Sequence, residues 1–205
     1  MSNMISQSLL PEFDMEMANT RKLLALVPES NLDFAPHPKS MSLSRLAGHV
    51  AEMPMWGVMT LGQDDLDMRP NGVAAFEAHK FTSRAASLAL FDENLAKARA
   101  LLAGASDADM MRNWSLKDNG KTLMTLPKVA VMRSFVMNHS IHHRAQLGVY
   151  LRMNNVSIPG MYGPLGRRSP NVRAPPTLIP TPSCGNMTST QTDLFEANAR
   201  YTDEG

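Results

Sequence analysis

The chain has 205 residues, of which 43% are hydrophobic and 19% charged, and its formal net charge is +1. This composition is that of a globular protein and not of a disordered one. The nearly balanced charge argues against electrostatic binding to nucleic acid or to a membrane surface. The one cysteine, Cys184, excludes an intrachain disulfide and a thiolate metal cluster. No stretch reads as a signal peptide or a membrane span, so the expected compartment is the cytoplasm.

Four long stretches carry apolar residues at the three- and four-residue spacing of an α-helix. The predicted helices span residues 5–27, 43–62, 83–102 and 125–154. Pro28 ends the first of them, and Ser42 is a suitable N-cap for the second. Pro127 suits the first turn of the fourth, where a missing N–H group costs nothing.

The segments between the helices differ in character. Residues 64–80 have little periodicity and are expected to form a loop that crosses the molecule. Residues 113–124 contain an Asp-Asn-Gly sequence that predicts a β-hairpin turn. The predicted fold class is therefore all-α. Residues 1–165 are expected to form an antiparallel four-helix bundle with a small hairpin insertion. Residues 166–205 contain five prolines and runs of Ser, Thr and Asn, which predict a poorly structured C-terminal tail.

Three histidines carry most of the functional information. His139 and His143 lie four residues apart in the fourth predicted helix and share its apolar face, so both imidazoles can reach one point in the core. His49 lies in the apolar stripe of the second helix and is the best candidate for a third ligand. Three histidines bind a divalent metal and leave coordination positions open, as catalytic metals require. The histidines could instead be interior residues that pack without a metal.

Other residues near this pattern allow more than one interpretation. His142 could pair with His139 at a spacing of three, although we favour a place on the surface or outside the ligand set. Glu52 follows His49 by three residues and is a candidate general base or hydrogen-bond acceptor, against the alternative of a solvated carboxylate. Tyr150 is the second candidate for proton handling. His37 and His79 lie in loop sequence and are expected to be solvated.

Three segments carry a resemblance to a known family. They are residues 36–56 (Pro-His-Pro-Lys-Ser-Met-Ser to Met-Pro-Met-Trp), residues 138–152 (Asn-His-Ser-Ile-His-His-Arg-Ala-Gln onward) and residues 156–164, which end in Tyr-Gly-Pro. With them, residues 5–164 resemble the DinB-like superfamily of metal-binding four-helix bundles, the bacterial damage-inducible DinB-type proteins. The resemblance implies a metal triad of His49, His139 and His143, a bound nickel or zinc ion, and a homodimer. Known relatives include thiol S-transferases that use bacillithiol or mycothiol, and a mycothiol-dependent isomerase.

The leading hypothesis is a metal-dependent enzyme that acts on small molecules, either a thiol S-transferase using a low-molecular-weight thiol or a hydrolase. The alternative is a non-catalytic metal-binding protein of the stress or damage response. A third possibility is an interaction module in which the histidines only pack. Motifs of other chemistries, including the Glu-x-x-His of di-iron bundles and His-Glu-x-x-His, do not occur in the sequence.

Overall fold

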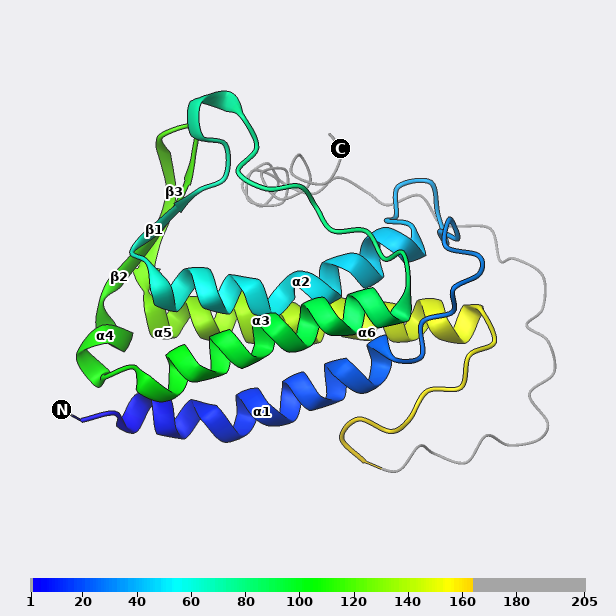
Figure 1. Cartoon of the computed structure of the whole chain (residues 1–205), viewed down its shortest axis with the longest axis horizontal. Helices are drawn as coiled ribbons and strands as arrows, with labels where there is room; N and C mark the ends of the chain where they lie inside the picture. The colour runs from blue at the N-terminus through cyan, green and yellow to red at the C-terminus, as the bar shows by residue number, and fades with distance from the viewer. Residues whose placement is uncertain (1, 164–205) are drawn as a thin grey trace, which may run out of the picture. The chain divides into compact units, whose positions relative to one another are not determined.

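The computed structural model describes residues 2–163, and the predicted tail, residues 166–205, lies outside them. Four long helices lie side by side (Figure 1). They are α1 (Met4–Leu24), α2 (Leu43–Gly62), α3 (Arg84–Gly104) and α6 (His139–Met153). This arrangement confirms the predicted four-helix bundle.

Shorter elements connect the long helices. They are β1 (Asp65–Asp67), the 3₁₀ turn η1 (Pro70–Gly72), α4 (Asp107–Met111), β2 (Asn113–Asp118), β3 (Lys121–Pro127), α5 (Lys128–Val131) and the π-helical segment η2 (Met132–Asn138). The strands form a small sheet at one end of the bundle, in the order β1-β2-β3 (Figure 1). The predicted hairpin is confirmed as the antiparallel pair β2–β3. Its turn residues Asn119 and Gly120 have φ angles of 49° and 79°, as a type I′ turn requires.

The direction of each helix follows from its contacts. Ion pairs Arg21–Asp92 and Arg99–Asp14 show that α1 and α3 run in opposite directions. By contrast, α2 and α3 run in the same direction, because residues 63–83 return along α2 before α3 begins (Figure 1). The bundle is therefore not a simple up-and-down one. The returning segment is also more ordered than predicted, since it contributes β1, which pairs in parallel with β2.

Serine caps fix where α2 and α3 begin. The Ser42 hydroxyl accepts a hydrogen bond from the Arg45 amide (3.2 Å), and the Ser83 hydroxyl accepts one from the Ala86 amide (3.1 Å). Each satisfies an amide that the first helical turn leaves without a partner. The second predicted helix matches α2 at both ends, and the first and third match α1 and α3 within three residues.

The fourth helix begins later than predicted. Residues 125–127 belong to β3, where Pro127 pairs with Asn113, and helical structure starts at Lys128. Hydrogen bonding to β2 therefore outweighs the helical pattern of these residues. From Lys128 the helix continues through α5, η2 and α6, with a π-helical middle that the sequence pattern did not predict.

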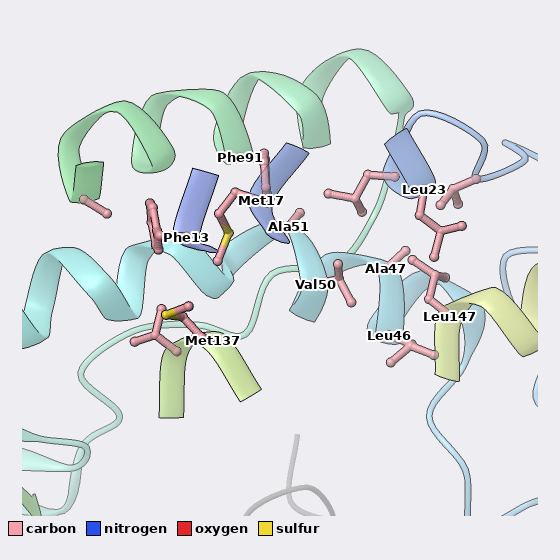
Figure 2. Packing of buried hydrophobic residues seen from close by; sticks show 14 of the residues in the cluster. Phe13, Met17, Leu23, Leu46, Ala47, Val50, Ala51, Phe91, Met137 and Leu147 are labelled. Carbon is pink, nitrogen blue, oxygen red and sulfur yellow. The ribbon is translucent and has the colours of Figure 1, made fainter. Parts of the chain in front are cut away.

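The core lies between the four helices and is built by residues with almost no exposure. Figure 2 shows side chains of α1, α2, α3 and the helix of η2 and α6 meeting there. The labelled members are Phe13, Met17, Leu23, Leu46, Ala47, Val50, Ala51, Phe91, Met137 and Leu147. In the described part of the chain no helix is both long and apolar enough to cross a membrane.

The returning segment crosses α2 in close contact at Gly48. A Cβ atom at this position would lie 2.2 Å from the carbonyl oxygen of His79. Such a distance is impossible without a shift of the backbone, so the absence of a side chain at Gly48 allows the segment to lie directly on the helix.

We predict that Gly48→Ala lowers the free energy of unfolding by about 1–3 kcal/mol, because the new methyl group overpacks the crossing. Gly104→Ala is the matched control, since a Cβ there meets no atom within 4 Å. That change should be neutral or stabilising by up to about 1 kcal/mol, because alanine restricts the unfolded chain. Urea denaturation measures both values. Equal effects of the two substitutions would contradict the close crossing.

Candidate metal centre

The imidazoles of His49, His139 and His143 meet between α2 and α6. Nε2 of His139 lies 3.4 Å from Nε2 of His49 and 2.7 Å from Nε2 of His143. The three potential ligand atoms all lie within 4.8 Å of one another. The structure therefore brings together the three residues that the sequence predicted as metal ligands.

Helix packing explains why they meet. His139 and His143 are one turn apart on α6, and α2 runs past them in the opposite direction, because Gly57 of α2 packs beside Met132 and Val136. A Cβ at Gly57 would lie 3.7 Å from side-chain carbons of both residues. Gly57 therefore places α2 in contact with the helix that carries His139 and His143, about two turns from the histidine cluster.

His49 is held by a buried carboxylate. Its Nδ1 donates a hydrogen bond to Oε1 of Glu52 (2.7 Å), and Oε2 of Glu52 accepts one from the main-chain amide of His79 (2.9 Å). Nη1 of Arg45 lies 3.5 Å from Oε1 of the same carboxylate. Glu52 is only 5% exposed, so the predicted alternative of a solvated carboxylate is wrong. The carboxylate fixes the orientation of the His49 ring and keeps a proton on its Nδ1.

The other two rings are also held from their outer sides. The main-chain carbonyl of Phe135, in the π-helical segment, accepts a hydrogen bond from the His139 ring. Because Nε2 of His139 faces the other imidazoles, the donor is Nδ1. Nδ1 of His143 donates to Oε1 of Gln146 (2.8 Å). Each of the three rings therefore carries its proton on Nδ1, and each Nε2 presents a lone pair to the centre of the cluster.

This donor set fits a divalent metal ion. Three lone pairs aimed at one another repel unless a cation lies between them, and imidazole nitrogen is a good ligand for zinc, nickel, copper and iron. Tetrahedral coordination with bonds of about 2.1 Å places ligand atoms about 3.4 Å apart. The His49–His139 separation has this value, whereas the 2.7 Å between His139 and His143 must widen.

The electrostatics of the cluster favour neutral rings. Burial, followed by the charge of neighbouring His49, lowers the pKa of His139 to about 4 and the pKa of His143 to about 3. Both side chains are therefore neutral at pH 7, the state in which imidazole binds metal. Burial alone would raise the pKa of Glu52, but hydrogen bonds from His49 and from the His79 amide bring it below its usual value. Glu52 is accordingly ionised.

The two predicted proton-handling residues have different surroundings. Both carboxylate oxygens of Glu52 already accept hydrogen bonds, one of them from a ligand ring. The Tyr150 hydroxyl donates to the carbonyl of Met41 (3.0 Å), and its ring packs edge-on against Phe34. Proton transfer by either residue stays a prediction. The observed contacts give Glu52 a positioning role and Tyr150 a contact with the α1–α2 connection.

The remaining histidines fall into two groups. His142 and His37 are exposed, as expected; Nε2 of His142 lies 3.1 Å from Nε2 of Gln146, and its ring packs edge-on against that of His143. His79 is not solvated as predicted. It is partly buried against α2, and its Nε2 is buried without a hydrogen-bond partner among residues 2–163. The close crossing at Gly48 explains this burial.

Two supporting groups were missed by the sequence prediction. Gln146 lies three residues after His143, a helical spacing that could have identified it. The Phe135 carbonyl had no such signal, because every residue has a carbonyl group and the π-helical geometry that presents this one was not predicted.

The fold and this three-histidine centre define a class of helical bundles suited to metal binding, and comparison with known proteins identifies the family. The sequence pattern of the DinB superfamily matches residues 12–147, well over half of the chain. The chain therefore belongs to the DinB superfamily. Among curated proteins none matches it significantly.

Solved structures agree on the fold. A DinB-like protein from Bacillus cereus is 22% identical with a TM-score of 0.57, and the match covers 76% of this chain and 97% of that one. A DinB-like protein from Bacillus subtilis is 17% identical with a TM-score of 0.56, covering 75% and 97%. YfiT from Bacillus subtilis, described as a probable metal-dependent hydrolase with an unusual four-helix bundle topology, is 18% identical with a TM-score of 0.55, covering 74% and 89%. At these identities the likeness concerns the fold.

We predict one divalent metal ion per chain, bound by His49, His139 and His143. The double substitution His139→Ala/His143→Ala should abolish binding, because a single imidazole holds a divalent ion weakly. His142→Ala should retain most of the binding, since this exposed ring is not one of the three grouped imidazoles. Zinc titration against a chromogenic chelator gives both affinities. Loss of metal in His142→Ala together with retention in His143→Ala would overturn the ligand assignment.

Proposed function

We propose that the protein is a metal-dependent hydrolase that acts on small molecules, with zinc or nickel as its metal. The observation that carries this proposal is the convergence of three Nε2 atoms whose rings are each held by a separate hydrogen-bond acceptor. Such preorganisation is typical of a centre whose ligand geometry matters for chemistry. The description of YfiT, a protein of similar fold, supports the same reaction class.

The ligand set favours catalysis over storage. Structural zinc sites are commonly closed by four protein ligands, whereas catalytic sites use three and leave a position for water or substrate. Within the described residues the cluster has three members. When bound, a divalent ion supplies Lewis acidity there, which lowers the pKa of a water or thiol and polarises an electrophilic carbonyl.

Charges around the cluster support the same role. The three histidines are uncharged in the form that binds metal. The negative charge of Glu52 is offset by the Arg45 guanidinium, which lies 3.5 Å from its Oε1. The protein therefore neutralises little of the charge that a divalent ion would bring. A site with thiolate or several carboxylate ligands would remove most of that charge and weaken its acidity.

The proposal is tested by comparing the zinc- or nickel-loaded protein with the metal-free protein on a panel of activated esters, amides and lactones. We expect hydrolysis that requires metal and that falls at least 100-fold in His139→Ala/His143→Ala. His142→Ala should keep most of the activity. The same panel supplemented with low-molecular-weight thiols separates the reaction classes.

The possible outcomes have distinct meanings. Turnover that requires a thiol would replace hydrolysis with thiol S-transfer. A loaded protein without turnover on either panel would favour a non-catalytic metal-binding role in the stress or damage response. The homodimer, the stress response and the cytoplasmic location stay predictions that sedimentation, expression and fractionation measurements address.

A second measurement separates the two roles of Glu52. Glu52→Gln should weaken zinc binding about 10- to 100-fold, because the amide cannot accept hydrogen bonds from both the His49 ring and the His79 amide. Turnover at saturating zinc should then change little. A large fall in turnover at full occupancy, with zinc affinity unchanged, would instead assign proton transfer to Glu52.

A further inference from the structure

The three supporting acceptors of the metal centre differ in rigidity. Glu52 is a buried carboxylate on α2, and the Phe135 carbonyl is part of the helix backbone. Gln146 is an exposed side chain on α6. An exposed glutamine has three rotatable bonds and little packing to restrain them. The ring of His143 is therefore the ligand with the most freedom to move.

For all three imidazoles to bind one metal ion, one of the rings has to move. The 2.7 Å between Nε2 of His139 and Nε2 of His143 is too short for two ligands of one metal ion, so this edge must open by several tenths of an ångström. His139 is tied to the backbone of its own helix. The adjustment therefore falls on His143 and on the amide of Gln146 that holds it.

Gln146 also links the centre to the surface. Its Oε1 accepts from Nδ1 of His143 (2.8 Å), and its Nε2 lies 3.1 Å from Nε2 of His142. An amide nitrogen only donates, so Nε2 of His142 must accept, and a neutral His142 then carries its proton on Nδ1. Metal at Nε2 of His143 thus determines the direction of every hydrogen bond out to His142.

We propose that Gln146 is the positioning residue of the adjustable ligand: it holds His143 in its metal-binding tautomer and is itself oriented by the exposed ring of His142. This inference rests on the metal centre of the proposed function but not on any reaction. The order of the three groups along α6, with Gln146 four residues after His142 and three after His143, makes the chain of hydrogen bonds local to one helix face.

Substitutions at Gln146 test the first half of the inference through zinc affinity. Gln146→Met keeps the length of the side chain but accepts no hydrogen bond from His143, so zinc binding should weaken about 10- to 100-fold. Gln146→Glu restores an acceptor and should bind zinc at least as tightly as the natural protein. Gln7→Met makes the same chemical change at another exposed helical position, and should have no effect on zinc affinity. Thermal unfolding of the metal-free variants checks that all of them are folded.

Nitrogen NMR of ¹⁵N-labelled histidine tests the second half. Spectra of the zinc-loaded protein at pH 8, where ordinary imidazoles are neutral, should show the His142 proton on Nδ1. In Gln146→Glu that proton should move to Nε2, because the carboxylate only accepts. A His142 proton on Nε2 in the natural protein would overturn the link to His142.

Zinc affinity within twofold of the natural value in Gln146→Met would overturn the positioning role. Neither readout uses turnover, so the two proposals fail separately. A protein that binds zinc with the expected dependence on Gln146 but hydrolyses nothing would contradict the hydrolase and leave this inference intact. A protein that binds no zinc would contradict this inference as well as the hydrolase.

Discussion

The bundle depends on a buried ion pair between α6 and α1. The side chains of Arg144 and Glu16 are 3% and 4% exposed, and Nη2 of Arg144 lies 2.5 Å from Oε2 of Glu16. The guanidinium also donates to the carbonyl of Glu16, to the Thr20 hydroxyl and to the Tyr162 hydroxyl. A buried charge is tolerated only when its partners are complete, and the removal of one partner costs about 3–5 kcal/mol. The pair therefore fixes both the rotation and the height of α6 against α1.

The ion pair also affects the histidine cluster, because Arg144 is the next residue after His143. Neighbours on an α-helix point about 100° apart. When Arg144 faces α1, His143 and His139 are turned toward α2, where His49 lies. The π-helical segment before His139 also affects how α6 is rotated, because its turns are wider than those of an α-helix. It lies between α6 and α5, and α5 directly follows strand β3 of the sheet. In the continuous helix of α5, η2 and α6, the N-terminal end can therefore follow the sheet while the C-terminal end is oriented by the ion pair.

Local sequence signals predicted those features that local interactions determine. The Ser42 cap predicted where α2 begins, and the Asn119-Gly120 turn predicted the hairpin. The four-residue spacing of His139 and His143 predicted two of the three clustered histidines. The apolar stripe of α2 was enough to add His49. The features that were missed depend on residues distant in sequence. Pairing with β2 extends β3 to Pro127 and orders β1, and close contact at Gly48 buries His79.

The character of the centre also follows from non-local packing. A carboxylate three residues after His49 predicted an acceptor, but only the crossing of residues 63–83 over α2 brings the His79 amide to its second oxygen and excludes water from it. Both oxygens of Glu52 accept hydrogen bonds, and the Arg45 guanidinium lies close by. The carboxylate therefore orients His49 and neutralises little of the positive charge at the centre. Three uncharged imidazoles, one on α2 and two on α6, are a donor set that would leave most of the charge of a divalent ion in place. A helical bundle suits this chemistry because each imidazole is oriented by an acceptor on its own helix, while the packing of α2 against the helix of η2 and α6 brings the rings together.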